Sequence, residues 1–332
     1  MTSPGETSPG LTDIHWRPGA SLHTLRLRAQ LLGQVRAFFA ARAVLEVDTP
    51  LLVGHAVTDP HLHCAEVRLP GRAGSLYLIS SPEYAMKRLL AAGSGDIYQM
   101  SHVFRGDESG RVHNAEFMLI EWYRLGCSLH ALMHETAQLA AQLLDLADSS
   151  PELVSYTEAF ERHAGVDPLR LDEHTARSLA RSHGLDRLAA ERFTLGELTD
   201  WLMGAVIGPQ LGGKRLCCLH HYPASQASLA RLDPADARFA LRFELYFRGV
   251  ELANGFEELA DPLEQRARFE MDQRERQARG LPLHAIDERL LAALHSPLPA
   301  AAGVALGFDR LLLLRTGAAS LDQVMPFTLE RA

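Results

Sequence analysis

The chain has 332 residues, of which 47% are hydrophobic and 22% are charged. This composition is ordinary for a globular protein and excludes global disorder. A net charge of -8 argues against long-range attraction to a nucleic acid, although it does not exclude a local basic patch. The chain contains no apolar run long enough for a transmembrane helix, and the opening segment MTSPGETSPG lacks the features of a secretory signal. We therefore expect a cytoplasmic protein without a membrane partner.

The first change along the chain comes near residue 20. Residues 1–20 are rich in Ser, Pro, Gly and Thr, which predicts a flexible tail followed by one domain over residues 21–332. Ser21 can cap a helix that ends near Ala43. The apolar stripe of this helix, at spacings of three and four, is Leu25, Ala29, Leu32, Val35 and Phe39.

The middle of the chain alternates between short strands and helices. Residues 44–47 and 76–79 read as strands, and Ser81-Pro82-Glu83 predicts a helix start. Residues 97–105 and 115–124 form a long predicted antiparallel hairpin around a polar loop. The later strands are predicted at 215–221, 239–248, 250–257 and 303–307, and the later helices at 129–147, 171–205, 262–279, 284–295 and 308–316.

Runs of strands with helices outside them favour an α+β fold with a mainly antiparallel sheet flanked by helices. The chain lacks GxGxxG and GxxxxGK[ST], so a Rossmann or P-loop nucleotide site is not expected. The run Cys217-Cys218-Leu219-His220-His221 allows a zinc cluster or a buried strand. We favour the strand, because adjacent cysteines point to opposite faces of a strand and do not easily share one tetrahedral site.

The predicted hairpin carries the first candidate site. On its return strand, alternation places Phe117, Leu119, Glu121 and Tyr123 on one face. A carboxylate and a phenol on a sheet face suit either solvent or a polar ligand. Arg105 at the mouth of the hairpin suits a phosphate, because the guanidinium fork matches phosphate oxygens.

Two further segments carry candidate ligands. Glu244 and Glu251 bracket a turn, and two carboxylates beside a phosphate site would hold Mg²⁺; a charged surface hairpin is the alternative. After the turn, Asn254, Phe256 and Glu258 alternate on one face. In the third segment, residues 303–310, small residues allow close approach of a ligand and Arg310 opens a helix. A buried small-residue strand with a surface arginine is the alternative there.

Together these segments resemble the signature motifs of class II aminoacyl-tRNA synthetases. Residues 44–50 (VLEVDTP) resemble motif 1, residues 104–117 resemble motif 2, and residues 303–310 resemble motif 3. SPEYAMKRLL, HNAEFMLIEWYR and ELANGFEEL most resemble the lysyl enzymes. The resemblance covers residues 21–332 and implies a class II catalytic domain that uses ATP and Mg²⁺.

The resemblance also implies the role of each matching residue. Arg105, Glu251 and Arg310 would be catalytic, and Glu244 and Glu251 would hold Mg²⁺ with the ATP phosphates. The implied ATP-binding residues are Arg105, Gly106, Asp107, His113, Asn114, Phe117, Glu244, Glu251, Leu252, Gly307 and Arg310. The implied amino-acid-binding residues are Ser81, Pro82, Glu83, Glu121, Tyr123, Asn254, Phe256, Glu258 and Ala305. Asp107 stands where the family usually has glutamate.

Lysyl-tRNA synthetases carry an N-terminal anticodon-binding domain, and here the helix that leads into motif 1 begins near residue 25, so we do not expect tRNA as a partner. The resemblance points to the branch of lysyl-synthetase paralogues that attaches (R)-β-lysine to a lysine of elongation factor P. Ser81 and Ala305, where lysyl enzymes usually have alanine and glycine, agree with that branch. Motif 1 implies a homodimer. The alternatives are a ligase with another acceptor and a paralogue without catalytic activity.

Overall fold

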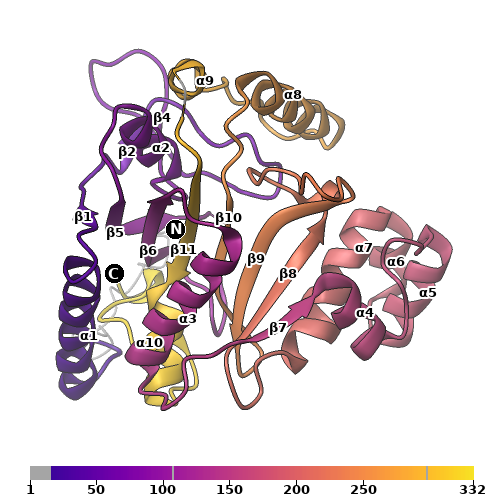
Figure 1. Cartoon of the computed structure of the whole chain (residues 1–332), viewed down its shortest axis with the longest axis horizontal. Coiled ribbons are helices and arrows are strands. Elements are labelled where there is room, and N and C mark those ends of the chain that lie inside the picture. Colours follow the sequence, from indigo (N-terminus) through magenta and orange to yellow (C-terminus); the bar gives the residue numbers. More distant parts are fainter. Residues whose placement is uncertain (1–15, 107, 297) are drawn as a thin grey trace, which may run out of the picture.

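The computed structural model describes residues 16–106, 108–296 and 298–332, and its centre is an eight-stranded sheet (Figure 1). The outermost pairs, β1 with β5 and β7 with β8, are parallel, and the inner pairs are antiparallel. The expected α+β fold with a mainly antiparallel sheet is therefore confirmed. In spatial order the strands are β1 (Leu45–Glu46), β5 (Ile97–Phe104), β6 (Glu116–Leu125), β11 (Ala301–Gly307), β10 (Val250–Glu257), β9 (Phe239–Phe247), β8 (Cys217–Pro223) and β7 (Glu152–Ser155).

A second sheet and a set of helices surround the large sheet. The small sheet has the order β2 (Leu52–Val53), β4 (Leu76–Leu78) and β3 (Glu66–Val67). The α-helices are α1 (Leu22–Ala40), α2 (Glu83–Ala91), α3 (Leu129–Leu144), α4 (Tyr156–Ala164), α5 (Glu173–Ser182), α6 (Arg187–Arg192), α7 (Leu195–Leu202), α8 (Pro262–Ala278), α9 (Glu288–His295) and α10 (Phe308–Thr316). Figure 1 shows α4 to α7 grouped beside β7 and β8 at the right of the view, whereas α8 and α9 lie together at the top.

The main hydrophobic core lies between one face of the large sheet and the helices α1, α3 and α10. Ile120 and Trp122 of β6 are fully buried in this core. Glu121 and Tyr123, which alternate with them, therefore point to the opposite face, as the sequence pattern predicts. That opposite face is free to carry a ligand site.

The N-terminal helix begins where the sequence predicts, but its buried face is rotated. Ser21 caps α1, since its hydroxyl accepts a hydrogen bond from the Thr24 backbone. The buried residues of α1 are Leu31, Val35, Phe38 and Phe39, whereas Ala29 of the predicted stripe is exposed. Local spacing identifies the helix, but the packing partners α3 and β1 decide which side is covered.

Two predicted helices differ from the structure. The segment 171–205 is divided into α5, α6 and α7, because Gly184 has a positive φ of 103° and Asp186 and Thr194 each cap a new helix. The helix predicted at 284–295 begins only at Glu288, where Asp287 caps it.

The cysteine run lies on β8, as the strand interpretation predicts. Both cysteines are buried, and they face different hydrophobic clusters: Cys218 packs in the main core and Cys217 in the cluster formed with α4 to α7. The opposite orientation of the two thiols follows from the strand alternation.

The end of the predicted tail is attached to the domain. Gly19 and Ala20 donate backbone hydrogen bonds to Pro326 and Met325, and Ala20 is buried. The rest of that prediction, for residues 1–15, lies outside the described residues. Among the helices that the structure describes, none has the length and apolar character needed to cross a membrane.

Candidate active site

Two adjoining cavities open on the sheet face opposite the main core. Arg105, Leu119, Glu251, Asn254 and Ala305 line both of them. The first cavity is further lined by His113, Asn114, Phe117, Leu252, Gly307 and Arg310, and the second by Ser81, Glu83, Glu121, Tyr123, Glu244, Phe256, Glu258 and Gly303. The structure therefore brings together nearly all of the predicted site residues.

Three predicted residues are not among the lining residues. Pro82 occupies the N-cap position of α2. Gly106 donates its backbone N–H to the carbonyl of His63, at 2.8 Å, which joins the motif 2 loop to the segment before β3. Asp107 lies outside the described residues.

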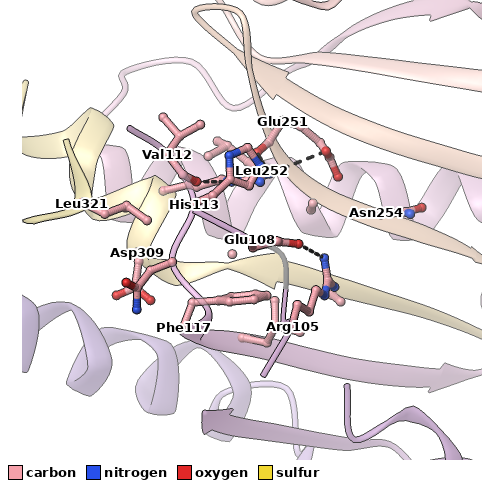
Figure 2. Close-up of a pocket in the computed structure, with 16 residues that line it drawn as sticks. Arg105, Glu108, Val112, His113, Phe117, Glu251, Leu252, Asn254, Asp309 and Leu321 are labelled. Carbon is pink, nitrogen blue, oxygen red and sulfur yellow. Dashed lines mark hydrogen bonds and ion pairs between the residues drawn. The ribbon is translucent and has the colours of Figure 1, made fainter. Parts of the chain in front are cut away.

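One side of the first cavity carries an aromatic ring beside a guanidinium. Arg105 Nη1 donates to Glu108 Oε1 at 3.0 Å, and its guanidinium lies 5.1 Å from the centre of the Phe117 ring. Figure 2 shows Arg105 and Phe117 on one side of the cavity, with Val112, His113 and Glu251 across from them.

Arg310 joins the motif 2 loop to the start of β10. Its Nε donates to the carbonyl of Val112 at 3.1 Å, and its Nη1 donates to the carbonyl of Glu251 at 3.2 Å. The same Nη1 lies 3.6 Å from Glu251 Oε2. Burial and the Arg310 charge lower the pKa of His113, so this ring is neutral at physiological pH. The side of the cavity that faces Phe117 therefore carries the Arg310 guanidinium beside the Glu251 side chain and a neutral imidazole.

Two buried side chains hold the motif 2 and motif 3 segments in place. Asn114 donates to the carbonyl of Glu116 at 2.6 Å and accepts from the Leu329 backbone at 3.2 Å. Asp309 accepts from the Met118 backbone at 2.7 Å and forms an ion pair with Arg28 of α1. Arg310 thus starts from a helix whose first turn is bonded to β6 and to α1.

A β-bulge brings Asn254 onto the sheet face that already carries Glu251. The pairing of β9 with β10 shifts by one residue between Glu251 and Ala253, so Leu252 is the extra residue. As a result Asn254 lies opposite Glu244, and Glu251 lines the same cavities as Asn254. Burial in the cleft wall and the charge of Glu244 raise the pKa of Glu251.

Glu244 is held by two neighbours that the sequence analysis did not identify. Arg242 Nη2 donates to Glu244 Oε1 at 2.6 Å, and the Tyr246 hydroxyl donates to Oε2 at 2.7 Å. Arg242 also stacks over Tyr222, 4.3 Å from the ring centre. The alternation of Arg242, Glu244 and Tyr246 along β9 was the available signal, because these residues share one face.

The second cavity has a carboxylate at its floor. Glu121 is 2% exposed; it accepts from the Tyr123 hydroxyl at 2.7 Å and from Ser81 Oγ at 2.8 Å. Burial raises the pKa of Glu121 to about 7, and the charge of Glu83 adds to this rise. The face that carries Phe117, Glu121 and Tyr123 is therefore the wall of an enclosed site and not a solvated surface.

The wall of the second cavity holds an ion cluster. Lys87 Nζ lies 2.7 Å from Glu83 Oε1 and 2.5 Å from Glu258 Oε2. Burial raises the pKa of Glu258 to about 8, although the Lys87 charge opposes the rise. The sequence analysis did not single out Lys87; its position four residues after Glu83 on a helix was the available signal.

Two small residues of β11 allow the groups of the second cavity to pack closely over the strand. A Cβ atom on Gly303 would lie 2.3 Å from the Tyr123 ring and 2.5 Å from Glu258 Oε1. Ala305 pairs with Glu121 on one side and Asn254 on the other, at the boundary of the two cavities. The predicted small-residue strand therefore forms the floor beneath both cavities.

The fold and these adjoining sites define a class II synthetase-type catalytic domain. Residues 12–331 match the family of class II tRNA synthetases (D, K and N), and the chain belongs to this family. The chain is an ATP-dependent ligase.

The curated relatives match most of the chain. It is 47% identical to the elongation factor P--(R)-beta-lysine ligase of Pectobacterium atrosepticum, 48% identical to that of Edwardsiella ictaluri and 46% identical to that of Salmonella dublin. Each match covers 96% of this chain and 98% of the relative.

Proposed function

We propose that this protein activates (R)-β-lysine with ATP as an aminoacyl-adenylate and transfers it to a lysine side chain of elongation factor P. The observation that carries the proposal is the junction of two cavities of different chemistry. One offers arginines and an aromatic ring, and the other offers three carboxylates, Glu83, Glu121 and Glu258. The named relatives support the same reaction.

The first cavity is suited to ATP. Phe117 offers a ring on which one face of adenine can stack. Arg310 would cover the other face of adenine and reach the γ-phosphate. Arg105 lies where it can bind the α-phosphate, since a guanidinium matches phosphate oxygens. His113, Asn114 and the backbones of Leu252 and Gly307 complete the proposed nucleotide pocket, and Gly106 and Asp107 would join from the motif 2 loop.

The second cavity is suited to an amino acid with two ammonium groups. Glu83, Glu121 and Glu258 supply three carboxylates against the single Lys87 ammonium. Unpaired negative charge in a buried site is costly, and an incoming dication relieves that cost. Tyr123, Ser81, Asn254 and Phe256 line the same wall, and Pro82 starts the helix that presents Glu83.

Glu244 and Glu251 suit a magnesium ion bound together with ATP. Mg²⁺ takes one or two carboxylates and leaves its remaining positions to water and substrate phosphates. Glu251 has a raised pKa beside Glu244, which a nearby cation would lower. Glu244 accepts two hydrogen bonds and keeps further lone pairs for a ligand. The bound ion would neutralise charge on the phosphates.

The proposed reaction has two steps. A carboxylate oxygen of the amino acid attacks the α-phosphorus, the bond to the bridging oxygen breaks, and pyrophosphate leaves. Arg105 and Arg310 stabilise the negative charge that spreads over the phosphates. In the second step the neutral amine of the acceptor lysine attacks the adenylate carbonyl. The amide forms, AMP leaves, and the attacking nitrogen releases its proton.

We also propose that Ala305 contributes to the choice of amino acid. Its methyl group lies between Glu121 and Asn254, where the ammonium group and the activated carboxylate of the substrate would meet. A methyl group there would crowd an α-amino group and tolerate an amino group one carbon further along.

We propose a homodimer formed through the motif 1 region. β1 lies at the edge of the large sheet, where a strand presents unpaired backbone groups. Leu45 of β1 is 55% exposed, and Pro50 is exposed nearby. Analytical ultracentrifugation tests this: a dimer that a Leu45→Glu substitution dissociates supports the proposal, and a monomeric wild type contradicts it.

The experiment that tests the main proposal is amino-acid-dependent exchange between ATP and labelled pyrophosphate. The substrates to compare are (R)-β-lysine, (S)-β-lysine and α-lysine, with a reaction lacking amino acid as the control. Strongest exchange with (R)-β-lysine, followed by labelling of elongation factor P, supports the proposal. Strong exchange without labelling points to another acceptor, and no exchange from folded protein contradicts adenylate formation.

A further inference from the structure

Lys87 joins carboxylates from separate elements of the fold. It lies on α2, one turn after Glu83, and is 1% exposed. Its ammonium reaches Glu83 on its own helix and Glu258 directly after β10. The ring of Phe256 lies 5.7 Å from the same ammonium. A single cation thereby sets the relative position of two carboxylates that line the amino-acid cavity.

We propose that Lys87 is a positioning residue: an internal counter-ion that holds Glu83 and Glu258 and leaves the cavity with the charge of a two-ammonium substrate. Three carboxylates and one ammonium give a net charge of two negative units when all are ionised. The inference rests on the proposed function, since it concerns how that substrate is bound. The charge would be three negative units without Lys87, and the carboxylates would repel one another.

The groups that face this cluster support the proposal. They are Glu83 from α2, Glu121 and Tyr123 from β6, and Glu258 after β10. The Lys87 charge acts against the burial that raises the pKa of both Glu258 and Glu121. Removal of that charge would leave these carboxyl groups protonated to higher pH. A protonated carboxyl group binds an ammonium group poorly, so the affinity for the substrate would fall. This is the opposite of what the removal of a repelling cation would give by itself.

The chain offers a matched control for this residue. It contains two lysines, and the second, Lys214, is exposed before β8. The variants are Lys87→Met, Lys87→Arg and Lys214→Met, and the measurement is the pH dependence of the KM for (R)-β-lysine in pyrophosphate exchange. We expect Lys87→Met to raise the KM by about 150-fold, the lower end of the loss when a buried ion pair loses one partner. As the pH is lowered, the KM of this variant should begin to rise at a higher pH than the KM of the wild type. Lys87→Arg should recover part of the loss, and Lys214→Met should match wild type.

A superimposable pH profile for Lys87→Met would overturn the proposal, because loss of packing alone changes the amount of active enzyme and not the pH at which binding is lost. If wild type shows no exchange, the proposed function fails instead. The second measurement needs neither a variant nor activity: two lysine signals are expected in a carbon-13 NMR spectrum of lysine-labelled wild type. Added (R)-β-lysine should shift the Lys87 signal and leave the Lys214 signal in place. An unchanged Lys87 signal at saturating ligand overturns the inference.

Discussion

Asn254 of β10 lies directly opposite Glu244 of β9, because Leu252 is an extra residue in the pairing of the two strands. In a regular pairing from the same turn, Ala253 would take that place and Glu251 would point away from Asn254. The bulge brings Asn254 and Phe256 onto the cavity face that Glu244 and Glu251 share. One inserted residue thus places a polar side chain and an aromatic ring beside the two carboxylates.

The first prediction concerns Glu251. Glu251→Gln removes the proposed metal-binding charge beside Arg310, and we expect pyrophosphate exchange to fall by about 100-fold, the loss typical when a group that stabilises transition-state charge is removed. The melting temperature should not fall, since burial and Glu244 disfavour the charged form. Glu270→Gln, an exposed position on α8, is the control. Equal exchange rates in the two variants would contradict the assigned role.

The second prediction concerns Ala305. Ala305→Gly should increase α-lysine activation relative to (R)-β-lysine by about tenfold, as expected for one methyl group in a binding site. The control is Ala302→Gly on the same strand, whose side chain faces the main core. That variant should lose stability and keep the wild-type ratio. The role of Ala305 is rejected if its variant also keeps the wild-type ratio.

The third prediction concerns the pH dependence of stability without substrate. Burial raises the pKa of Glu121 to about 7 and that of Glu258 to about 8, above the ordinary value of 4.5. Between the ordinary pKa of 4.5 and the raised pKa values, the folded protein binds more protons than the unfolded chain. The free energy of unfolding therefore falls as the pH rises from about 4.5 to about 8. Glu121→Gln should flatten this decline, as measured by urea unfolding at several pH values.

The same linkage predicts that a bound dication releases protons. Its ammonium groups lower the pKa of both carboxyl groups, so calorimetric binding heats at pH 7 should depend on the ionisation enthalpy of the buffer. Glu270→Gln should leave both measurements unchanged. A decline as steep in Glu121→Gln as in wild type would show that Glu121 does not titrate in this window.

The fourth prediction concerns Gly303. Gly303→Ala places a Cβ atom 2.3 Å from the Tyr123 ring and 2.5 Å from Glu258 Oε1, so one of these side chains must move. We expect a loss of about 1–3 kcal/mol in stability and weaker amino-acid binding. Gly213→Ala, in open space, is the control. Thermal unfolding and the KM for (R)-β-lysine are the two measurements, and wild-type values for both would exclude the crowding.

Short-range patterns account for the parts of the fold that the sequence predicted well. The hairpin predicted at 97–105 and 115–124 is found as β5 and β6, with the predicted residues on each face. The end of α5 was missed, because Gly184 and the Asp186 cap act within one turn and hardly alter the longer apolar pattern.

The sequence by itself determined the class of the protein, because the synthetase motifs are local strings whose charged residues can be read one at a time. It also determined the strand alternation that separates the core from the cavities. Only the tertiary structure decided how the carboxylates are balanced. Lys87 meets Glu258 across 171 positions of sequence. This burial and this charge pairing depend on residues distant in the chain, so strand and helix periodicity cannot reveal them.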